Sequence, residues 1–344
     1  MNLATIPPDA PFLDLLAARW LAETPAEAVP RGIILLPTRR AARALAEAFL
    51  RAGGGRPMLL PRITAIGALD EAPLALAGAL ELAPAIAPLP RLAALARLIL
   101  ALPPSQGGAG PEAAGGGGAA RAWKLAEALA GLMDEAEQQE LDLPAALRGA
   151  TGGEHAAHWQ ITLDFLAIVT RAWPAHLAEQ GLLNPVARRV RLLHAQAAAW
   201  EEEAPEGRVW VAGLTGAIPA VARLLRAVAR LERGLVVLPG LDRAMDEAAW
   251  LKLEASHPQA GLRALLAGMG AARAEVAEWR APGPRVALLG RALLPAAALK
   301  TWRDAGPDAA RIDELRHLAP GDPQHEAVAI ALILRDALER PGAR

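Results

Sequence analysis

Residues 32–50 read Gly-Ile-Ile-Leu-Leu-Pro-Thr-Arg-Arg-Ala-Ala-Arg-Ala-Leu-Ala-Glu-Ala-Phe-Leu, and this stretch decides the fold class. Ile33 to Leu36 form an uninterrupted apolar run, which is typical of a parallel strand buried on both faces. Pro37 ends the run, because proline has no N–H to donate to a neighbouring strand. Thr38 is a residue type favoured at the start of a helix, and alanine-rich helix formers follow it. The stretch therefore predicts a strand, a tight turn and a helix.

Three arginines follow this strand directly. Arg39, Arg40 and Arg43 lie in or just after the turn, at the carboxyl end of the strand. In an open α/β sheet, ligands bind at that edge. A threonine hydroxyl, the free N–H groups of a helix start and guanidinium groups together suit a phosphate. The alternative is a solvated first turn, whose arginines only keep the helix soluble.

The composition is that of a globular protein, with 53% hydrophobic and 21% charged residues in 344. This length allows one to three domains. Only three of the 36 basic residues are lysines, a bias that fits a GC-rich genome and reduces the weight of any arginine count. The net charge of −1 gives no global sign of nucleic-acid binding. However, residues 31–62 contain seven arginines and one acid, and a local basic surface can bind phosphate on a neutral protein.

Several classes of site and location are disfavoured. The chain has no cysteine, which excludes disulfides, thiolate nucleophiles and iron–sulfur clusters within it. The N-terminal residues do not have the pattern of a signal peptide. No apolar run reaches the ~18 residues of a membrane span, so we expect a cytoplasmic protein without membrane contact.

The first 71 residues alternate between strand and helix patterns. Strands are predicted at 3–8, 33–36 and 58–66, with Arg62 and Thr64 near the end of the third. Helices are predicted at 11–22 and after Thr38, the second one broken by the glycines at 53–55. This alternation indicates a parallel sheet, and hence an α/β fold.

The middle of the chain has a different character. Residues 72–203 lack strand patterns and are predicted to be an all-helical insertion, with a disordered glycine-rich linker at 103–119. The clearest helices are expected at 120–141, at 154–181 with a kink at Pro174, and from 185 to about 200.

Strand patterns return after the insertion. Two buried strands are predicted at 208–213 and 235–242, and a further short strand at 285–289. Helices are predicted at 219–231, in most of 244–270, and at 323–340.

The sequence lacks the motifs of an ATPase. A P-loop needs Gly-x-x-x-x-Gly-Lys-Ser/Thr, and none of Lys124, Lys252 and Lys300 has that context. The first strand instead runs into Pro7-Pro8, which cannot donate N–H groups to a phosphate, and no Walker B acid follows a strand. We therefore expect no ATP hydrolysis by this segment. His155 and His158 lie one turn apart but have no evident third ligand, so packing or surface roles are favoured over a metal site.

Short blocks of sequence resemble the AddB family, the B subunits of AddAB helicase–nucleases of alphaproteobacterial type. The blocks occur in the family's order: Thr5-Ile-Pro-Pro, Leu35-Leu-Pro-Thr-Arg-Arg-Ala-Ala, His158-Trp-Gln, Ala212-Gly-Leu-Thr-Gly-Ala-Ile-Pro, Val237-Leu-Pro-Gly-Leu-Asp and His257-Pro-Gln. The resemblance implies the N-terminal part of a longer protein with a fold like a superfamily 1 helicase. It implies a RecA-like domain 1A at 1–71 and 204–300, a helical 1B-like insertion at 72–203, and the start of a truncated second RecA-like domain at 301–344.

The resemblance also implies a role in double-strand break repair and recombination. Family members act with the A subunit, an ATP-driven motor, on broken DNA ends. Their nuclease domain and iron–sulfur cluster would lie beyond this segment, so no cofactor is expected here. Residues that match or follow the DNA-contacting segment of related helicases are Thr38, Arg39, Arg40, Arg43, Arg62 and Thr64.

Three hypotheses follow. The first is a non-catalytic, helicase-like module that binds single-stranded or duplex-end DNA. The second is a protein-interaction scaffold that docks the motor subunit without touching DNA. The third is an unrelated α/β enzyme that uses a phosphate-bearing ligand at the same strand ends.

Overall fold

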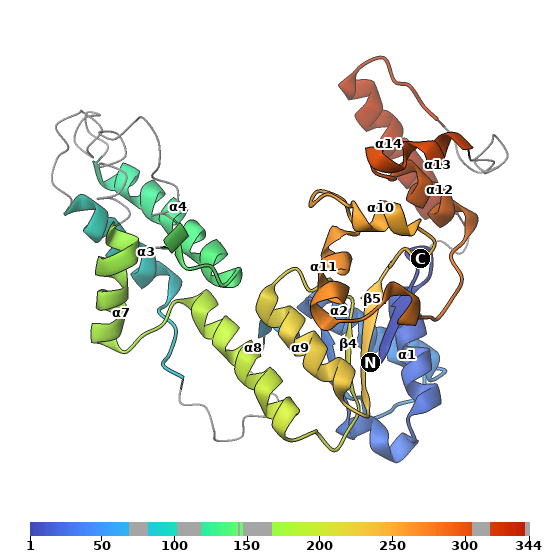
Figure 1. Cartoon of the computed structure of the whole chain (residues 1–344), viewed down its shortest axis with the longest axis horizontal. Helices are drawn as coiled ribbons and strands as arrows, with labels where there is room; N and C mark the ends of the chain where they lie inside the picture. The colour runs from blue at the N-terminus through green and yellow to red at the C-terminus, as the bar shows by residue number, and fades with distance from the viewer. Residues whose placement is uncertain (69–81, 102–117, 144, 147–166, 305–316, 341–344) are drawn as a thin grey trace.

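The computed structural model describes residues 1–68, 82–101, 118–143, 145–146, 167–304 and 317–340 (Figure 1). Its centre is one all-parallel sheet of six strands in the order β3-β2-β4-β5-β1-β6. The strands are β1 (Leu3–Ile6), β2 (Ile33–Leu36), β3 (Arg62–Ala65), β4 (Val209–Ala212), β5 (Gly234–Pro239) and β6 (Ala277–Glu278). The α/β class expected from the sequence is confirmed.

One face of the sheet is covered by α1 (Phe12–Glu23) and α2 (Arg39–Ala52), the helices that follow β1 and β2. Alternate residues of each strand point to this face, as the pleat requires, so Trp210 of β4 lies here. Trp210 packs edge-to-face on Trp20 of α1, with ring centroids 4.9 Å apart, and both rings are fully buried. This aromatic pair anchors α1 on the sheet.

The other face is covered by helices that follow β3, β4 and β5. These are α8 (Pro185–Glu202), α9 (Pro219–Arg230), α10 (Glu247–Leu251) and α11 (Ala260–Met269). Val209 and Val211 of β4 point to this side and pack into a core that includes Trp200 of α8. Strands β1, β2, β4 and β5 are thus buried on both faces, which explains their continuous apolar runs in the sequence.

The helical part of the chain forms a separate core. It contains α3 (Pro88–Leu100), α4 (Gly118–Gln138) and α7 (Trp173–Gln180), which share a cluster of buried side chains. A π-helical turn, Ile168–Ala172, leads directly into α7, and Pro174 lies in the first turn of that helix. The predicted break near Pro174 therefore appears as a change from π to α geometry, in which the missing N–H of proline falls where no helical partner is needed.

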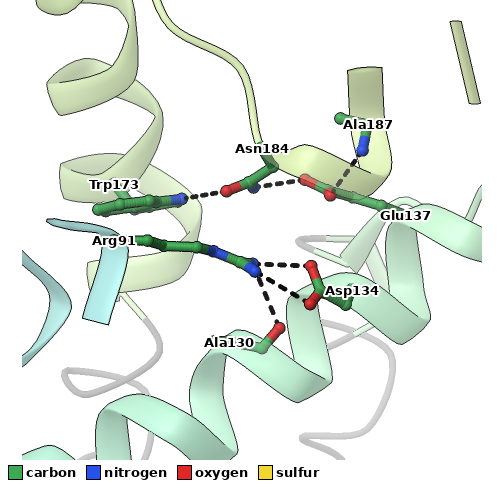
Figure 2. Close-up of polar contacts among 7 residues, drawn as sticks. All are labelled: Arg91, Ala130, Asp134, Glu137, Trp173, Asn184 and Ala187. Carbon is green, nitrogen blue, oxygen red and sulfur yellow. Dashed lines mark hydrogen bonds and ion pairs between the residues drawn. The ribbon is translucent and has the colours of Figure 1, made fainter. Parts of the chain in front are cut away.

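Two sets of hydrogen-bonded polar residues lie within the helical part (Figure 2). Arg91, which is 6% exposed, pairs with Asp134 at 2.8 Å and also donates to the carbonyl oxygen of Ala130. On α4, Glu137 accepts hydrogen bonds from Asn184 Nδ2 at 2.6 Å and from the backbone N–H of Ala187 at 3.2 Å. Burial raises the pKa of the Glu137 carboxyl above its ordinary value, although its hydrogen bond from Asn184 acts in the opposite direction.

Helix α8 belongs to both parts of the molecule. Its first turn is bound by Glu137 of α4, and its later residues Leu193, Ala197 and Trp200 lie in the core of the sheet. The proposed insertion at 72–203 therefore ends in a helix that packs on the sheet, rather than in a linker. Figure 1 shows α8 running beside α9 toward the helical part.

The C-terminal elements lie along the carboxyl edge of the sheet and beyond it. They are α12 (Pro284–Ala292), α13 (Leu299–Asp304) and α14 (Pro323–Glu339), with short 3₁₀ turns at Arg273–Glu275 and Ala296–Ala298. Two further 3₁₀ turns, Ala26–Arg31 and Ile66–Ala68, precede β2 and follow β3. No residue of α14 is buried.

The strand predicted at 285–289 is wrong. These residues form the middle of α12, which begins at Pro284, a favoured first residue of a helix. The sixth strand is instead Ala277–Glu278, a two-residue strand that pairs with β1 at the edge of the described sheet. The proposed linker at 103–119 and the first half of the helix predicted at 154–181 fall largely outside the described residues.

Candidate nucleic-acid interface

The turn between β2 and α2 has the geometry that the sequence predicts. Thr38 has extended backbone angles (φ −137°, ψ 156°), and its hydroxyl oxygen accepts a hydrogen bond from the N–H of Ala41 at 3.1 Å. It is therefore the N-cap of α2, and it satisfies one N–H group of the first turn. The helix ends at Ala52, where Gly53, Gly54 and Gly55 follow, the last two with positive φ.

The structure gathers Thr38, Arg39, Arg40 and Arg43 at the amino end of α2, and we call these four residues the arginine group. All four are exposed, and the first turn of α2 contains no acidic residue. Arg39 has a further contact, whereas Arg40 and Arg43 have no hydrogen-bond or ion-pair partner within the described ranges. Two guanidinium groups are thus available to a ligand.

The position of these arginines is electrostatically unfavourable for the protein alone. The amino end of a helix carries a partial positive charge, so a cation there is destabilising by a few tenths of a kcal/mol when exposed. Arg39 and Arg43 are also separated by one helical turn and repel each other. A bound anion would relieve both effects.

A second loop borders the arginine group. Gly213 follows β4 with φ +75°, and a Cβ atom added there would lie 3.6 Å from the ring of Pro37. Gly216 also has a positive φ, and Thr215 between the two glycines is exposed. Thr215 is not among the site residues expected from the sequence, although a pair of glycines after a buried strand signals a turn at the same edge.

The arginine group lies at a change in the direction of the connections. Helix α2, which follows β2, covers one face of the sheet, and α9, which follows the adjacent β4, covers the other. Neighbouring parallel strands whose connections leave on opposite faces create the crevice where α/β proteins bind ligands.

Arg62 is not part of this group. It is the first residue of β3 and pairs with Ile33, the first residue of β2, so it lies at the amino edge of the sheet. The expectation that Arg62 lies near the end of its strand is wrong, because the strand begins at this residue and ends at Ala65. Thr64 pairs with Leu35, one position before the carboxyl edge, and is half-buried.

The basic stretch at 31–62 is also dispersed by folding. Arg31 ends the turn before β2 at the amino edge, and Arg51 at the far end of α2 pairs with Asp14 at 2.6 Å. Only Arg39, Arg40 and Arg43 of the seven arginines share the carboxyl edge at the start of α2.

Two sizeable cavities lie within the described part of the chain. One, of about 440 Å³, lies in the helical part beside Glu137 and Trp173. The other, of about 560 Å³, opens at the carboxyl ends of β1, β5 and β6 and is lined by Pro7, Pro8 and Asp242. Neither contains a residue of the arginine group, which is a surface site.

Metal and membrane features are sparse. Among the described residues, no three His, Asp or Glu side chains are grouped as metal ligands would be, and His155 and His158 lie outside those residues. Within the same ranges, no helix has the length and apolar character needed to cross a bilayer. Comparison of the sequence with protein-family models and with curated proteins gives no match.

Proposed function

We propose that this chain is a non-catalytic, helicase-like DNA-binding module from the B subunit of a helicase–nuclease that acts in double-strand break repair and recombination. The observation that carries the proposal is the arginine group, in which three exposed guanidiniums meet a capped helix start at the ligand edge of a parallel sheet. The sequence blocks similar to AddB supply the choice of DNA among phosphate-bearing ligands.

The fold is compatible with this proposal. A single all-parallel sheet in which β1 lies inside, between β5 and β6, is consistent with a RecA-like α/β fold. We assign domain 1A to residues 1–71 and 204–300, a 1B-like insertion to 72–203, and the start of a second RecA-like domain to 301–344. The proposed partner in this assembly is the A subunit, the ATP-driven motor.

The arginine group would contact the DNA backbone rather than the bases. Exposed guanidiniums fit phosphate oxygens in a bidentate manner, and these contacts carry no sequence information directly. Each phosphate neutralised on a single strand lowers the logarithm of the binding constant by about 0.7 per tenfold increase in salt. The two guanidiniums without a described partner, those of Arg40 and Arg43, therefore contribute about −1.4 to this slope.

The test is single-strand DNA binding by fluorescence anisotropy over a salt series. The wild type is compared with the triple variant Arg39→Ala, Arg40→Ala, Arg43→Ala. The control variant replaces three exposed arginines that lie away from the arginine group, Arg31, Arg56 and Arg230, with alanine and so removes the same charge. We expect salt-sensitive binding by the wild type and the control, with a slope that is smaller by about 1.4 in the triple variant. Equal loss in both variants, or no binding by the folded wild type, would contradict the proposal.

A protein-interaction scaffold is the second candidate, because α14 is unusually apolar for an exposed helix. Its residues 327–334 are all apolar, and Ile330, Leu332 and Leu334 are each more than half exposed. A helix that is apolar on all sides is normally buried. Capture of the motor subunit by both the wild type and the triple arginine variant, with unchanged DNA binding by the complex, would favour this function over direct DNA contact.

A further inference from the structure

The larger cavity lies at a second change in the direction of the connections. Helix α1, which follows β1, covers one face of the sheet, and the helices that follow the adjacent β5 cover the other. The cavity of about 560 Å³ opens at the carboxyl ends of these two strands and of β6. Its position and volume are those of a small-molecule site in an α/β protein.

The cavity offers few hydrogen-bond donors to a ligand. Gln259 donates to the carbonyl oxygen of Gly240 at 2.8 Å and accepts from the N–H of Asp242 at 3.0 Å. His257 accepts from the N–H of Gln259 at Nδ1 and lies 2.8 Å from the carbonyl oxygen of Leu293 at Nε2, so the neutral tautomer protonated at Nε2 satisfies both contacts. The hydrogen-bonding groups of both side chains are therefore already used within the protein.

The backbone of the cavity lacks donors as well. Pro7, Pro8, Pro258 and Pro282 line it, and proline has no N–H. The hydroxyl of Thr5 donates to the carbonyl oxygen of Leu238 and accepts from the N–H of Leu241. A phosphate chain needs several N–H donors, so this cavity is poorly suited to a nucleotide.

Acceptors, in contrast, remain available. Asp242 uses Oδ1 to accept from the N–H groups of Ala244 and Met245, and its Oδ2 has no hydrogen-bond partner in the described ranges. The exposed carboxylate of Glu278 also has no partner there. The single arginine of the lining, Arg243, donates to the carbonyl oxygen of Ala274, so the cavity has two carboxylates against one engaged guanidinium.

Helix α12 forms an apolar wall of the cavity beside Asp242, whose Oδ2 would lie 2.8 Å from a Cβ atom added to Gly290. Helix α12 contributes Val286 and Leu289, and Leu293 follows at its end. Leu289 is 56% exposed and Leu293 48%, which leaves an uncovered apolar surface at the mouth. Such a surface suits the aliphatic stem of an amphipathic ligand.

We propose that this cavity binds an aliphatic cation, an ammonium or guanidinium group at Asp242 and Glu278 whose apolar stem lies along Leu289 and Leu293. The ligand is a free polyamine-like molecule or the side chain of an arginine or lysine from a partner, since both present the same chemistry. The site is separate from the arginine group and does not depend on DNA binding.

The test is titration of the whole chain with two probes at low salt, followed by thermal unfolding and calorimetry. Agmatine carries a guanidinium and an ammonium on an aliphatic stem, and N-acetyl-arginine methylamide represents a protein side chain. We expect saturable binding of at least one probe and a rise in unfolding midpoint with its concentration, because the probe binds the native state. Tighter binding of agmatine assigns the site to free polyamines, and tighter binding of the arginine derivative assigns it to a partner side chain.

Matched variants tie this binding to the cavity. The double variant Asp242→Asn, Glu278→Gln should weaken binding at least tenfold while it keeps the Oδ1 acceptor of residue 242, and Glu278→Gln alone serves if the double variant does not fold. The control Glu232→Gln, Glu254→Gln removes two exposed acids that are not in the lining and should bind as the wild type does. Absence of binding by the wild type at millimolar probe, equal weakening in the control, or tighter binding of ATP than of either cation would overturn the proposal.

Discussion

Replacement of Arg40 and Arg43 by glutamine should stabilise the free protein while it weakens DNA binding. Both side chains are exposed and without described partners at the amino end of α2, where the helix carries partial positive charge. Glutamine keeps a long side chain of similar helix propensity, so the change removes charge and little else. Arg39 stays unchanged, because it has a further contact.

The magnitude follows from two effects. Removal of each exposed cation from the helix start contributes about 0.3 kcal/mol, the low end for solvated positions. Relief of repulsion between Arg43 and its neighbours Arg39 and Arg40, four and three positions away respectively, contributes about 0.2–0.5 kcal/mol for each pair. The expected gain in the free energy of unfolding is about 1 kcal/mol at low salt. It should disappear at 1 M salt, where the Debye length is about 3 Å.

Urea unfolding followed by tryptophan fluorescence measures this gain. The buried pair Trp20 and Trp210 lies between α1 and the sheet and so reports on the part of the molecule that contains α2. DNA anisotropy on the same samples gives the affinity. A variant that loses stability, or that gains stability but binds DNA as tightly as the wild type, would refute the reasoning, because the arginines would then be structural or merely solvating.

Three further changes test the structure. Thr38→Ala should cost about 1 kcal/mol in urea unfolding through loss of the N-cap bond, whereas Thr38→Ser should be nearly neutral. Gly32→Ala should cost about 1–3 kcal/mol or more in the same assay, because the added Cβ would lie 2.2 Å from the ring of Trp20. Glu137→Gln should gain stability relative to the wild type as pH rises from 4.5 to 7.5 in thermal unfolding. The raised pKa means that the native wild type binds the proton more tightly than the unfolded chain and loses stability as that proton leaves, so a pH-independent difference would contradict the assignment.

The elements with strong local signals could be predicted from the sequence. The buried run at 33–36, the N-cap Thr38 and the glycines after Ala52 each encode their structure within a few residues, and all three predictions are confirmed. These local signals also fix where Thr38, Arg39, Arg40 and Arg43 lie, because residues in the turn between a parallel strand and its helix are at the carboxyl edge of the sheet.

Features set by tertiary pairing could not be predicted. The two-residue β6 has no periodicity of its own and exists because Ala277 and Glu278 meet the open edge of β1. The position of Arg62 at the amino edge depends on its register with Ile33, which lies 29 positions earlier and is fixed by the sheet rather than by local sequence. The cavity beside β1 and β5 likewise brings together Thr5 and Gln259, which no sequence spacing relates.

The order of the strands in the sheet has a consequence for synthesis on the ribosome. Strands β1 to β3 emerge first, but β2 is joined to the rest of the sheet only through β4, which follows about 140 residues after β3. At about 5–20 residues per second, that interval lasts on the order of 7 to 30 s. During this time the edge of β2 that later pairs with β4 stays unpaired. The edge of β1 stays unpaired for longer, because its partner β5 comes later in the chain and Leu238 of β5 is 233 positions from Thr5. The helical part, whose contacts are more local, can be complete before the sheet closes, so the nascent chain should depend on chaperones that shield strand edges while the insertion is being made.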